Sequence, residues 1–538
     1  MNLFAQSVRR LALNIRLGEV VFVAAITGIA FFLRSYDLLN YPPGFHGDEG
    51  LAGFDAQRVL REGWVGPYLP SSLGYPSGPA YATAAIVKVL GSSAFSVRLA
   101  PALMGTLTIP IAYAAFRVMY GYRVAVLSAT FLAFSAWHIH YSRVAFLPIA
   151  WPLMEVVTMF FLFIAVRTRR WYYFAAAGFA TGFGVYSYGS YPVFALGLAI
   201  FLLWFGLRAY FPRYLPAFFG DMMVFASAVY IAAFSMIQYA SNSNNNYFTR
   251  VRSLSITNTA RWHNAADPLE KGHILFQQAK HWLVAMTWRG QFDGTDAAGA
   301  GPMLDKLTVA LAAAGLIILV LNWRRLPYAF AIAMLITIPL GSIMTIDGVY
   351  RRTLGLAPVL VVLMALPLAG VWRWADQQHQ VRLKSLAYGV VAVVVALVAL
   401  FNVRYYFGTL GASDGARWTF AEELASASRH IEKAHPDLVY FYAARWHYGY
   451  ETRKFLAPDI PGEDRSREWS KTQTLSLKAD RSKDVLFIFI GGYMNLLGEV
   501  QSLYPEGQAF NGLSNDKRLL YIAFLVPRES DSAAAPGR

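Results

Sequence analysis

The chain has 538 residues, of which 56% are hydrophobic and only 15% are charged. Soluble domains usually carry about 25% charged residues, so this composition excludes an ordinary soluble protein. The formal net charge of +15 does not predict nucleic-acid binding, because the basic residues form no stripe on a soluble surface. The absence of cysteine excludes disulfide bonds and cysteine-based metal sites.

The apolar residues gather in long runs. A helix needs about 20 such residues to cross a bilayer, and the sequence predicts a polytopic α-helical membrane protein with about eleven transmembrane helices. Arginines precede the first run as in a signal peptide, but no cleavage site of small residues follows, so we interpret this run as a retained first helix. The predicted spans are 18–34, 98–119, 124–141, 148–166, 172–187, 192–207, 218–239, 306–322, 327–344, 353–372 and 386–404.

The charges of the connecting loops indicate the orientation. With the N-terminus in the cytoplasm, every loop predicted to be cytoplasmic is basic, as the positive-inside rule requires. An odd number of spans then places the C-terminus outside the cytoplasm. The basic residues of these inner loops are Arg117, Arg123, Arg167, Arg169, Arg170, Arg208, Arg213, Arg324, Arg325, Arg373, Arg382 and Lys384.

Three long segments fall on the outer side. Two of them, 35–97 and 240–305, interrupt a transmembrane domain predicted over residues 1–406. We expect a re-entrant or interfacial helix at 79–90 in the first segment and a helix at 268–288 in the second.

The third outer segment is the tail. We predict a helix at 420–433, ended near a proline, and short buried strands at 438–443, 485–490 and 519–526. These elements indicate a small C-terminal α/β extracytoplasmic domain over 407–528, which is long enough for its own core. The polar end, 529–538, is predicted to be disordered.

The most informative string is FHGDEG at 45–50, just outside the first span. An aspartate placed there, Asp48, with Glu49 beside it, is a candidate general base, and His46 is a candidate cavity residue. An ordinary solvated loop with turn residues accounts for the same string equally well. A divalent-metal site at His46, Asp48 and Glu49 is a weaker alternative, because the spacing matches no common ligand pattern.

Several arginines lie on the outer side, where topology gives no reason for them. Arg351 and Arg352 follow Tyr350 between spans nine and ten, and Arg143 and Arg98 are further exceptions. The arginine guanidinium suits phosphate because its donors form a fixed fork. These residues are therefore candidates for binding a lipid-linked phosphate at the outer leaflet, and contact with bilayer headgroups is the alternative.

Glu155 is an acid within the fourth span. An ionisable group there usually faces a polar cavity or a partner. The sequence leaves two interpretations open: Glu155 faces the same cavity, or it pairs with Arg98 or Arg143.

The order of these motifs resembles a known family. A basic N-terminus and one span precede the acidic pair. GYPSGPAY follows, then SVRLA at the start of span two, WHIHYSR at the end of span three and two arginines before span ten. Over residues 18–400 this pattern is similar to membrane glycosyltransferases of the C-type (GT-C) fold. It is closest to the family-39-like bacterial branch, related to protein O-mannosyltransferases and lipid A aminoarabinose transferases.

The resemblance implies an inverting glycosyltransferase of the bacterial inner membrane. It implies a polyprenyl-phosphate sugar donor, a protein, lipid or polysaccharide acceptor, Asp48 as general base and arginines on the leaving phosphate. It requires no cofactor. The chain departs from the pattern at two places: RVAFLPIA carries no acid after Arg143, and YPSGP at 75–79 replaces a Lys-Pro-Pro element. The second departure argues against lipid A as acceptor.

Other functions remain as alternatives. A transporter or flippase of lipid-linked sugars would favour ionisable residues or broken helices near the midplane and repeated halves. The sequence shows few intramembrane charges and no repeat. A non-catalytic relative that binds glycans through its tail is a third alternative.

Overall fold

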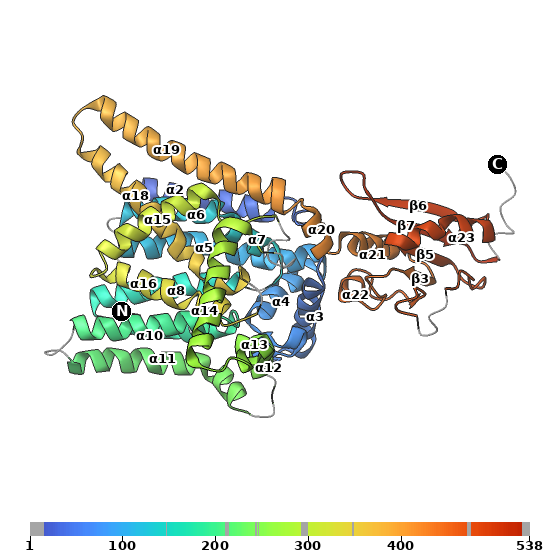
Figure 1. Ribbon diagram of the computed structural model, residues 1–538, viewed down its shortest axis with the longest axis horizontal. Helices are drawn as coiled ribbons and strands as arrows, with labels where there is room; N and C mark the ends of the chain where they lie inside the picture. Colours follow the sequence, from blue (N-terminus) through green and yellow to red (C-terminus); the bar gives the residue numbers. More distant parts are fainter. Residues whose placement is uncertain are drawn as a thin grey trace.

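The computed structural model describes residues 16–146, 148–209, 215–242, 245, 247–291, 300–346, 349–470 and 475–529. Figure 1 shows a large helical body and a smaller C-terminal domain, which lie one after the other along the longest axis of the molecule. The helical body contains the predicted transmembrane region, and the smaller domain contains the predicted tail domain.

A helix lies at the place of each predicted span. Among the residues that the structure describes, seven helices are long and apolar enough to cross a membrane, or eight if α6 and α7, which meet at 52°, form one bent span. Helices α9, α10 and α15 are shorter, so the predicted count of eleven is not confirmed. The helices are α2 (Leu17–Ser35), α5 (Ala94–Tyr120), α6 (Tyr122–Phe134), α7 (Ala136–Arg143), α8 (Ala150–Thr168), α9 (Trp171–Phe183), α10 (Pro192–Ala209), α11 (Leu215–Ser241), α15 (Lys306–Leu321), α16 (Leu326–Thr337), α17 (Leu340–Ile343), α18 (Leu356–Gln377) and α19 (Val381–Arg404).

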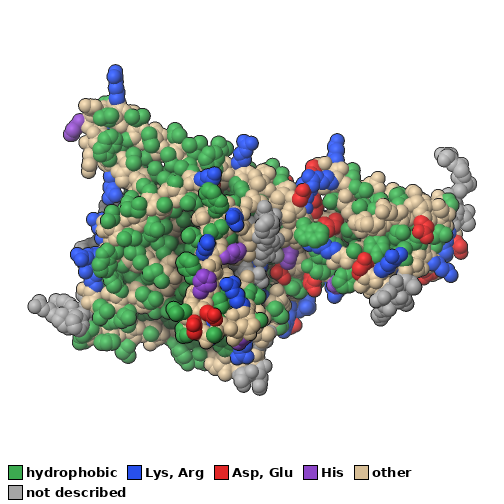
Figure 2. All heavy atoms as spheres, in the orientation of Figure 1, with side chains coloured by type: hydrophobic (Ala, Val, Ile, Leu, Met, Phe, Trp, Pro, Cys, Tyr) green, Lys and Arg blue, Asp and Glu red, His purple; other side chains and the backbone are tan. Residues whose placement is uncertain are grey.

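The core of the helical body is formed by α5, α6, α8 and α18, whose side chains are mostly buried. Helices α11 and α19 lie at its edges and leave most of their apolar side chains exposed, as lipid-facing helices do. Hydrophobic side chains also cover the visible face of the body in Figure 2. The chain is therefore a multi-pass membrane protein.

The two ends of the helical body differ in charge. Three features lie at the end away from the C-terminal domain (Figure 1): the connection from α18 to α19, the C-terminal end of α10 and the N-terminal end of α11. Several Lys and Arg side chains gather at that end in Figure 2. All the long outer segments lie toward the other end, beside the C-terminal domain.

Two of the outer segments fold into short helices over the end of the bundle. The predicted helices at 79–90 and 268–288 are observed as α4 and α14. The first segment contains α3 (Gly47–Glu62), β1 (Tyr68–Leu69), η1 (Ser71–Leu73), β2 (Tyr75–Pro76) and α4 (Gly78–Leu90); the second contains α12 (Tyr247–Leu254), η3 (Ile256–Asn258), α13 (Ala260–His263), α14 (Pro268–Val284) and η4 (Ala285–Arg289).

The C-terminal domain is a five-stranded sheet with helices, reached through η6 (Tyr405–Leu410) and α20 (Asp414–Thr419). Strands β4, β3 and β5 are parallel, and β7 is antiparallel to both β5 and β6. Every residue of β3 and β5 is buried, which explains their continuous apolar sequences. The elements are α21 (Glu422–Ala434), β3 (Leu438–Tyr442), α22 (Glu451–Leu456), β4 (Gly462–Asp464), β5 (Val485–Ile490), η7 (Gly491–Leu496), α23 (Leu497–Leu503), β6 (Gln508–Leu513) and β7 (Leu519–Val526).

The predicted helix and three strands of this domain are therefore confirmed, whereas β4, β6 and α22 were not predicted. Disorder was predicted for 529–538, of which all but Glu529 lie outside the described residues.

The C-terminal domain packs directly on α3. Three glycines on one face of α3 meet the segment 450–455. A Cβ on Gly47 would lie 2.9 Å from the Tyr450 hydroxyl, and one on Gly50 would lie 2.8 Å from the carbonyl oxygen of Glu451. One on Gly53 would overlap Phe455. The absence of side chains at these positions lets α3 approach the backbone of α22 at Gly50 and leaves room for the rings of Tyr450 and Phe455 at Gly47 and Gly53.

Candidate functional site

Asp48 lies in the first turn of α3. His46 caps this helix: its Nδ1 accepts from the backbone N–H of Asp48 at 3.0 Å, and its own N–H donates to Glu49 at 3.0 Å. This reciprocal arrangement fixes where the helix begins. The Asp48 side chain is 37% exposed, and the Ser72 hydroxyl donates to its Oδ1 at 3.3 Å. The side chain lies at the positive end of the helix dipole.

Glu49 has a different environment from Asp48. Its side chain is 0% exposed, and its two oxygens accept from Nε and Nη2 of Arg98, each at 2.8 Å. Arg98 is also fully buried and donates to the carbonyls of Leu38, Pro42 and Gly44. Glu49 therefore ties α3 and the chain before it to α5. It does not line the cavity described below, and we do not retain its predicted catalytic role.

Arg143 is likewise held by backbone. It is fully buried and donates to the carbonyl oxygens of Leu33, Tyr36, Asp37 and Tyr41. These contacts connect α7 to the end of α2. Because they occupy most of its donors, Arg143 is not placed to bind a donor phosphate.

A cavity of about 490 Å³ opens beside Asp48. This volume lies in the usual range of small-molecule sites, about 300–1,000 Å³. Its walls come from α3, the segment before α4, the turn after α9, α12, and the ends of α16–α17. Its charged residues are Asp48, Arg250 and Arg352, and its apolar side includes Leu51, Val193, Val251, Leu254, Leu340 and Met344.

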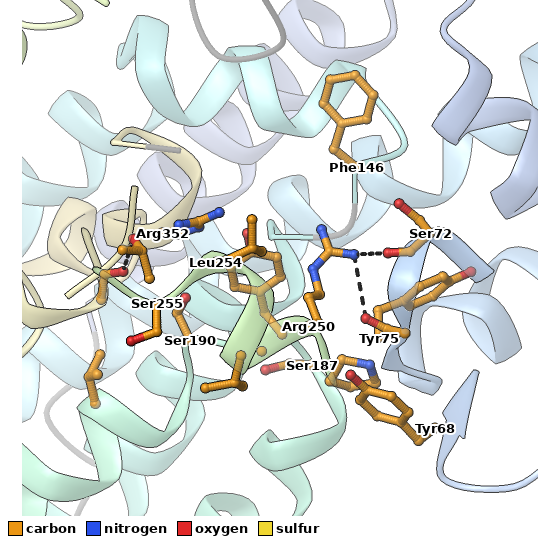
Figure 3. A pocket seen from close by; sticks show the side chains of 18 of the residues that line it. Tyr68, Ser72, Tyr75, Phe146, Ser187, Ser190, Arg250, Leu254, Ser255 and Arg352 are labelled. Atoms are coloured by element: carbon orange, nitrogen blue, oxygen red, sulfur yellow. Dashed lines mark hydrogen bonds between the residues drawn. The ribbon is translucent and has the colours of Figure 1, made fainter. Parts of the chain in front are cut away.

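The two arginines reach the cavity from different parts of the chain. Arg352 belongs to η5 (Arg351–Thr353), just before α18, and is 6% exposed. Arg250 lies on α12 and donates to the carbonyl oxygens of Ser72 and Gly74. Figure 3 shows the guanidinium of Arg250 directed toward Ser72, with Arg352 entering from the neighbouring segment. Two positive charges and one carboxylate thus share one cavity.

Arg351 does not line the cavity but lies near His46. Burial is the main cause that lowers the pKa of His46 below its ordinary value of 6.5. The positive charges of Arg351 and Arg445 lower it further. The charges of Asp48 and Glu49 oppose this effect without reversing it. His46 is therefore neutral at neutral pH, as its acceptor role at the helix cap requires.

Tyr350 and Glu155 lie away from the cavity. The buried Tyr350 hydroxyl donates to the carbonyl of Ala285 at 2.7 Å, which anchors the segment before α18. Glu155 is fully buried on α8, and its oxygens have no hydrogen-bond partner among the described residues. The interpretation that it pairs with Arg98 or Arg143 is wrong, because those side chains bind Glu49 and backbone carbonyls instead.

Arg250 and the Tyr75–Asp55 pair were missed by sequence reasoning. Tyr75 lines the cavity, and its hydroxyl donates to the buried carboxylate of Asp55, which also accepts from Ser71 at 3.0 Å. This pair fixes the loop that faces Arg250. The signal for Arg250 was present, since it is an arginine in an outer segment, like Arg351 and Arg352.

No group of three or more His, Asp and Glu side chains that could hold a metal ion occurs in the described part of the chain. The predicted alternative of a site at His46, Asp48 and Glu49 has no support in the geometry, because Glu49 is directed away toward Arg98.

The architecture has counterparts among solved structures. ArnT from Cupriavidus metallidurans bound to undecaprenyl phosphate superposes with a TM-score of 0.52 at 15% identity, covering 95% of this chain and 98% of that chain. The Archaeoglobus fulgidus oligosaccharyltransferase in complex with zinc and sulfate superposes with a TM-score of 0.51 at 15% identity, covering 95% of this chain and 73% of that chain. The chain therefore has the fold of the C-type membrane glycosyltransferases.

A family model agrees with the fold. Residues 75–234 match the dolichyl-phosphate-mannose-protein mannosyltransferase family. The resemblance predicted from the sequence is thus confirmed. No curated protein matches the sequence.

Proposed function

We propose that the chain is an inverting glycosyltransferase, which moves a sugar from a polyprenyl-phosphate donor to an acceptor at the outer face of the membrane. The observation that carries the proposal is the single cavity lined by Asp48, Arg250 and Arg352 at the end of the helical body beside the outer segments. A base and two phosphate-binding cations are the groups that this reaction needs.

The cavity matches the two halves of such a donor. Its apolar wall, from Leu51 and Val193 to Met344, suits an isoprenoid chain, and its arginines suit the phosphate. The structural relative ArnT was solved with undecaprenyl phosphate, a ligand of this class. We infer that the donor lipid of this chain enters the same cavity from the outer leaflet.

The chemistry assigned to each residue follows from charge. The acceptor hydroxyl attacks the anomeric carbon, and its proton passes to the Asp48 carboxylate. The bond from that carbon to the phosphate oxygen breaks, and the electron pair leaves with the polyprenyl phosphate. Arg250 and Arg352 stabilise the negative charge that develops on this leaving group. Attack opposite the leaving group inverts the configuration.

The proposal includes a placement in the cell. Residues 1–406 form the transferase domain in the bacterial inner membrane, with the N-terminus in the cytoplasm, and 407–528 form an extracytoplasmic domain. The basic residues at the end of the bundle away from the C-terminal domain support this orientation.

Turnover in nanodiscs tests the function. Wild-type protein and Asp48→Asn are incubated with a panel of radiolabelled polyprenyl-phosphate hexoses and pentoses, and release of polyprenyl phosphate is measured. We expect release by wild type with one donor class and a decrease of about 10²–10⁴-fold in Asp48→Asn, which is typical of losing a general base. The matched control is Glu62→Gln, which neutralises an exposed acid at the far end of α3.

Near-normal turnover by Asp48→Asn would show that Asp48 is not the general base. Binding of donors without release of polyprenyl phosphate by wild type would instead favour a transporter of lipid-linked sugars. Vesicles with the labelled donor on one side then measure its movement directly.

A further inference from the structure

A row of aromatic side chains and one arginine crosses the C-terminal domain next to α3. We call it the ledge, and its members are Trp418, Arg445, Trp446, His447, Tyr450 and Trp469. The Arg445 guanidinium lies 3.3 Å from the ring centre of Trp418 and 4.1 Å from that of Trp446. The row continues through ring-to-ring contacts. The ring centres are 4.8 Å apart for Trp446 and Tyr450, 5.8 Å for Tyr450 and His447, and 5.3 Å for His447 and Trp469.

The middle of the ledge lies beside Asp48. The Tyr450 hydroxyl meets the backbone of Gly47, the residue before Asp48. Burial and the negative charges of Glu451 and Asp48 raise the pKa of Tyr450. No described residue of the C-terminal domain lines the donor cavity. Asp48 therefore lines the donor cavity, and the residue before it meets the ledge at Tyr450.

The ledge is built to bind rather than only to fold. Trp418 is 61% exposed and Trp469 is 41% exposed, and both follow the last candidate span, Val381–Leu410. Nη1 of Arg445 is buried and lies 3.6 Å from Glu423, while the Arg445 side chain as a whole is 27% exposed. The same carboxylate accepts from Nε1 of Trp446 at 2.9 Å and fixes this ring within the row. The exposed rings of Trp418 and Trp469 and the partly exposed Arg445 thus stand together on a rigid support.

These groups fit a saccharide better than a peptide or a lipid. Aromatic rings offer apolar faces with polar edges, and the neighbouring Arg445 offers donors for hydroxyl groups. An extended peptide would pair with an edge strand, here β4 or β6, but the ledge comes from α20 and from the loops after β3 and β4. A lipid acceptor would need a continuous aliphatic groove, which this row of ring side chains does not provide.

We propose that the ledge is the acceptor site and that the acceptor is a saccharide, whose hydroxyl it presents to Asp48. The proposal rests on the proposed function and names its acceptor class. The proton of the bound hydroxyl passes to Asp48, its oxygen bonds to the anomeric carbon, and the polyprenyl phosphate leaves on the cavity side.

Binding is tested first, without turnover. Full-length protein in nanodiscs is mixed with maltohexaose, chitohexaose or a mannan hexasaccharide, and saturation-transfer NMR detects contact. We expect transfer to at least one hexasaccharide, loss in Trp418→Ala, recovery in Trp418→Phe and retention in Asp48→Asn. The control is Trp171→Ala, which removes a tryptophan of similar exposure, 64%, from the helical body. Transfer only to a serine-rich dodecapeptide would overturn the saccharide class.

Kinetics then separate the two proposals. We expect Trp418→Ala to raise the acceptor KM about tenfold while the donor KM stays unchanged. An unchanged acceptor KM in both Trp418→Ala and Arg445→Met would overturn the ledge and leave the transferase assignment intact. The protein could instead bind a saccharide through Trp418 but release no polyprenyl phosphate. That result would overturn the proposed function and would leave the ledge as a saccharide-binding site.

Discussion

Asp48 and Glu49 are neighbours in the sequence and have opposite environments. Adjacent residues of a helix point in directions about 100° apart, so one can face a cavity while the other faces a packed helix. Asp48 remains partly exposed, whereas Glu49 is buried against Arg98. A buried carboxylate requires such a partner because removal from water is costly for an unpaired charge. The sequence analysis named Asp48 as the candidate base and kept Glu49 beside it, but no local pattern indicated that Glu49 is buried against Arg98.

The two cavity arginines should act on donor binding. We expect Arg250→Ala and Arg352→Ala each to raise the donor KM about 10- to 100-fold, because each loses charge-assisted hydrogen bonds to phosphate. Arg252→Ala, which removes a charge from the same helix away from the cavity, should have little effect. Measurement of donor KM for the three variants checks this. An equal increase in all three would indicate only a general electrostatic attraction.

His46 should make stability depend on pH. Its pKa in the folded protein is lower than its ordinary value of 6.5, so below pH 6.5 the unfolded chain binds more protons than the folded chain. The free energy of unfolding should therefore decrease as pH falls below 6.5, by at most about 1.4 kcal/mol per pH unit. Thermal unfolding between pH 5 and 8 measures this slope. Refolding after each scan checks that the transition is reversible and can be treated as two-state.

The matched variant for this experiment is His46→Asn. Asparagine is a good N-cap residue and does not titrate, so it keeps an acceptor for the Asp48 N–H. We expect the part of the slope due to His46 to disappear in this variant. A slope identical to that of wild type would show that another group is responsible.

Among the elements, α3 connects the site to the rest of the molecule. Its N-terminus carries Asp48, its buried Glu49 binds α5 through Arg98, and its glycine face meets α22. Both of these connections involve residues far away in the sequence. The position of the candidate base is therefore set by tertiary contacts rather than by α3 alone.

Breaking the Glu49–Arg98 pair should destabilise the protein strongly. Arg98→Met leaves the buried Glu49 charge without its partner, and we expect a loss of about 3–5 kcal/mol. Arg58→Met, which breaks the exposed Arg58–Glu62 pair of α3, should cost about 0.3–0.5 kcal/mol. Denaturation in detergent compares the two. The double variant Glu49→Leu with Arg98→Met should recover part of the loss, and similar unfolding of both single variants would contradict the assigned role.

The success of the sequence prediction differed between elements for physical reasons. The spans and strands β3, β5 and β7 have apolar runs that report burial directly. Strand β6 has the sequence QAFNGL and is mostly exposed, so it lacks that signal. The site was only partly predictable because Arg250 and Asp48 are brought together by folding, and no local pattern reports a contact between distant segments.

At the scale of the whole molecule, the distribution of basic residues and the position of the cavity indicate the same orientation. The basic loops lie at the end of the bundle away from the C-terminal domain, and the cavity lies among the outer segments. A donor held at the outer leaflet and an acceptor outside the cytoplasm would both reach this end.

Cysteine labelling tests the orientation, and the chain has no cysteine of its own to interfere. We expect a membrane-impermeant maleimide to label Ser482→Cys, in the C-terminal domain, in intact spheroplasts. His379→Cys, between α18 and α19, should be labelled only after permeabilisation. Both side chains are exposed, so accessibility within the protein does not limit the reaction. The reverse pattern would invert the proposed topology.

The contact between α3 and the C-terminal domain has a consequence for biosynthesis. The Thr452 hydroxyl donates to the carbonyl of Phe45 at 2.8 Å, across a sequence separation of 407 residues. At about 5–20 residues per second, the ribosome adds this partner about 20–80 seconds after the helix that bears Asp48. During that interval α3 lacks the neighbour that packs on its glycine face. If the proposed function holds, a newly made chain would become active only after its C-terminal domain has been synthesised and has packed against α3.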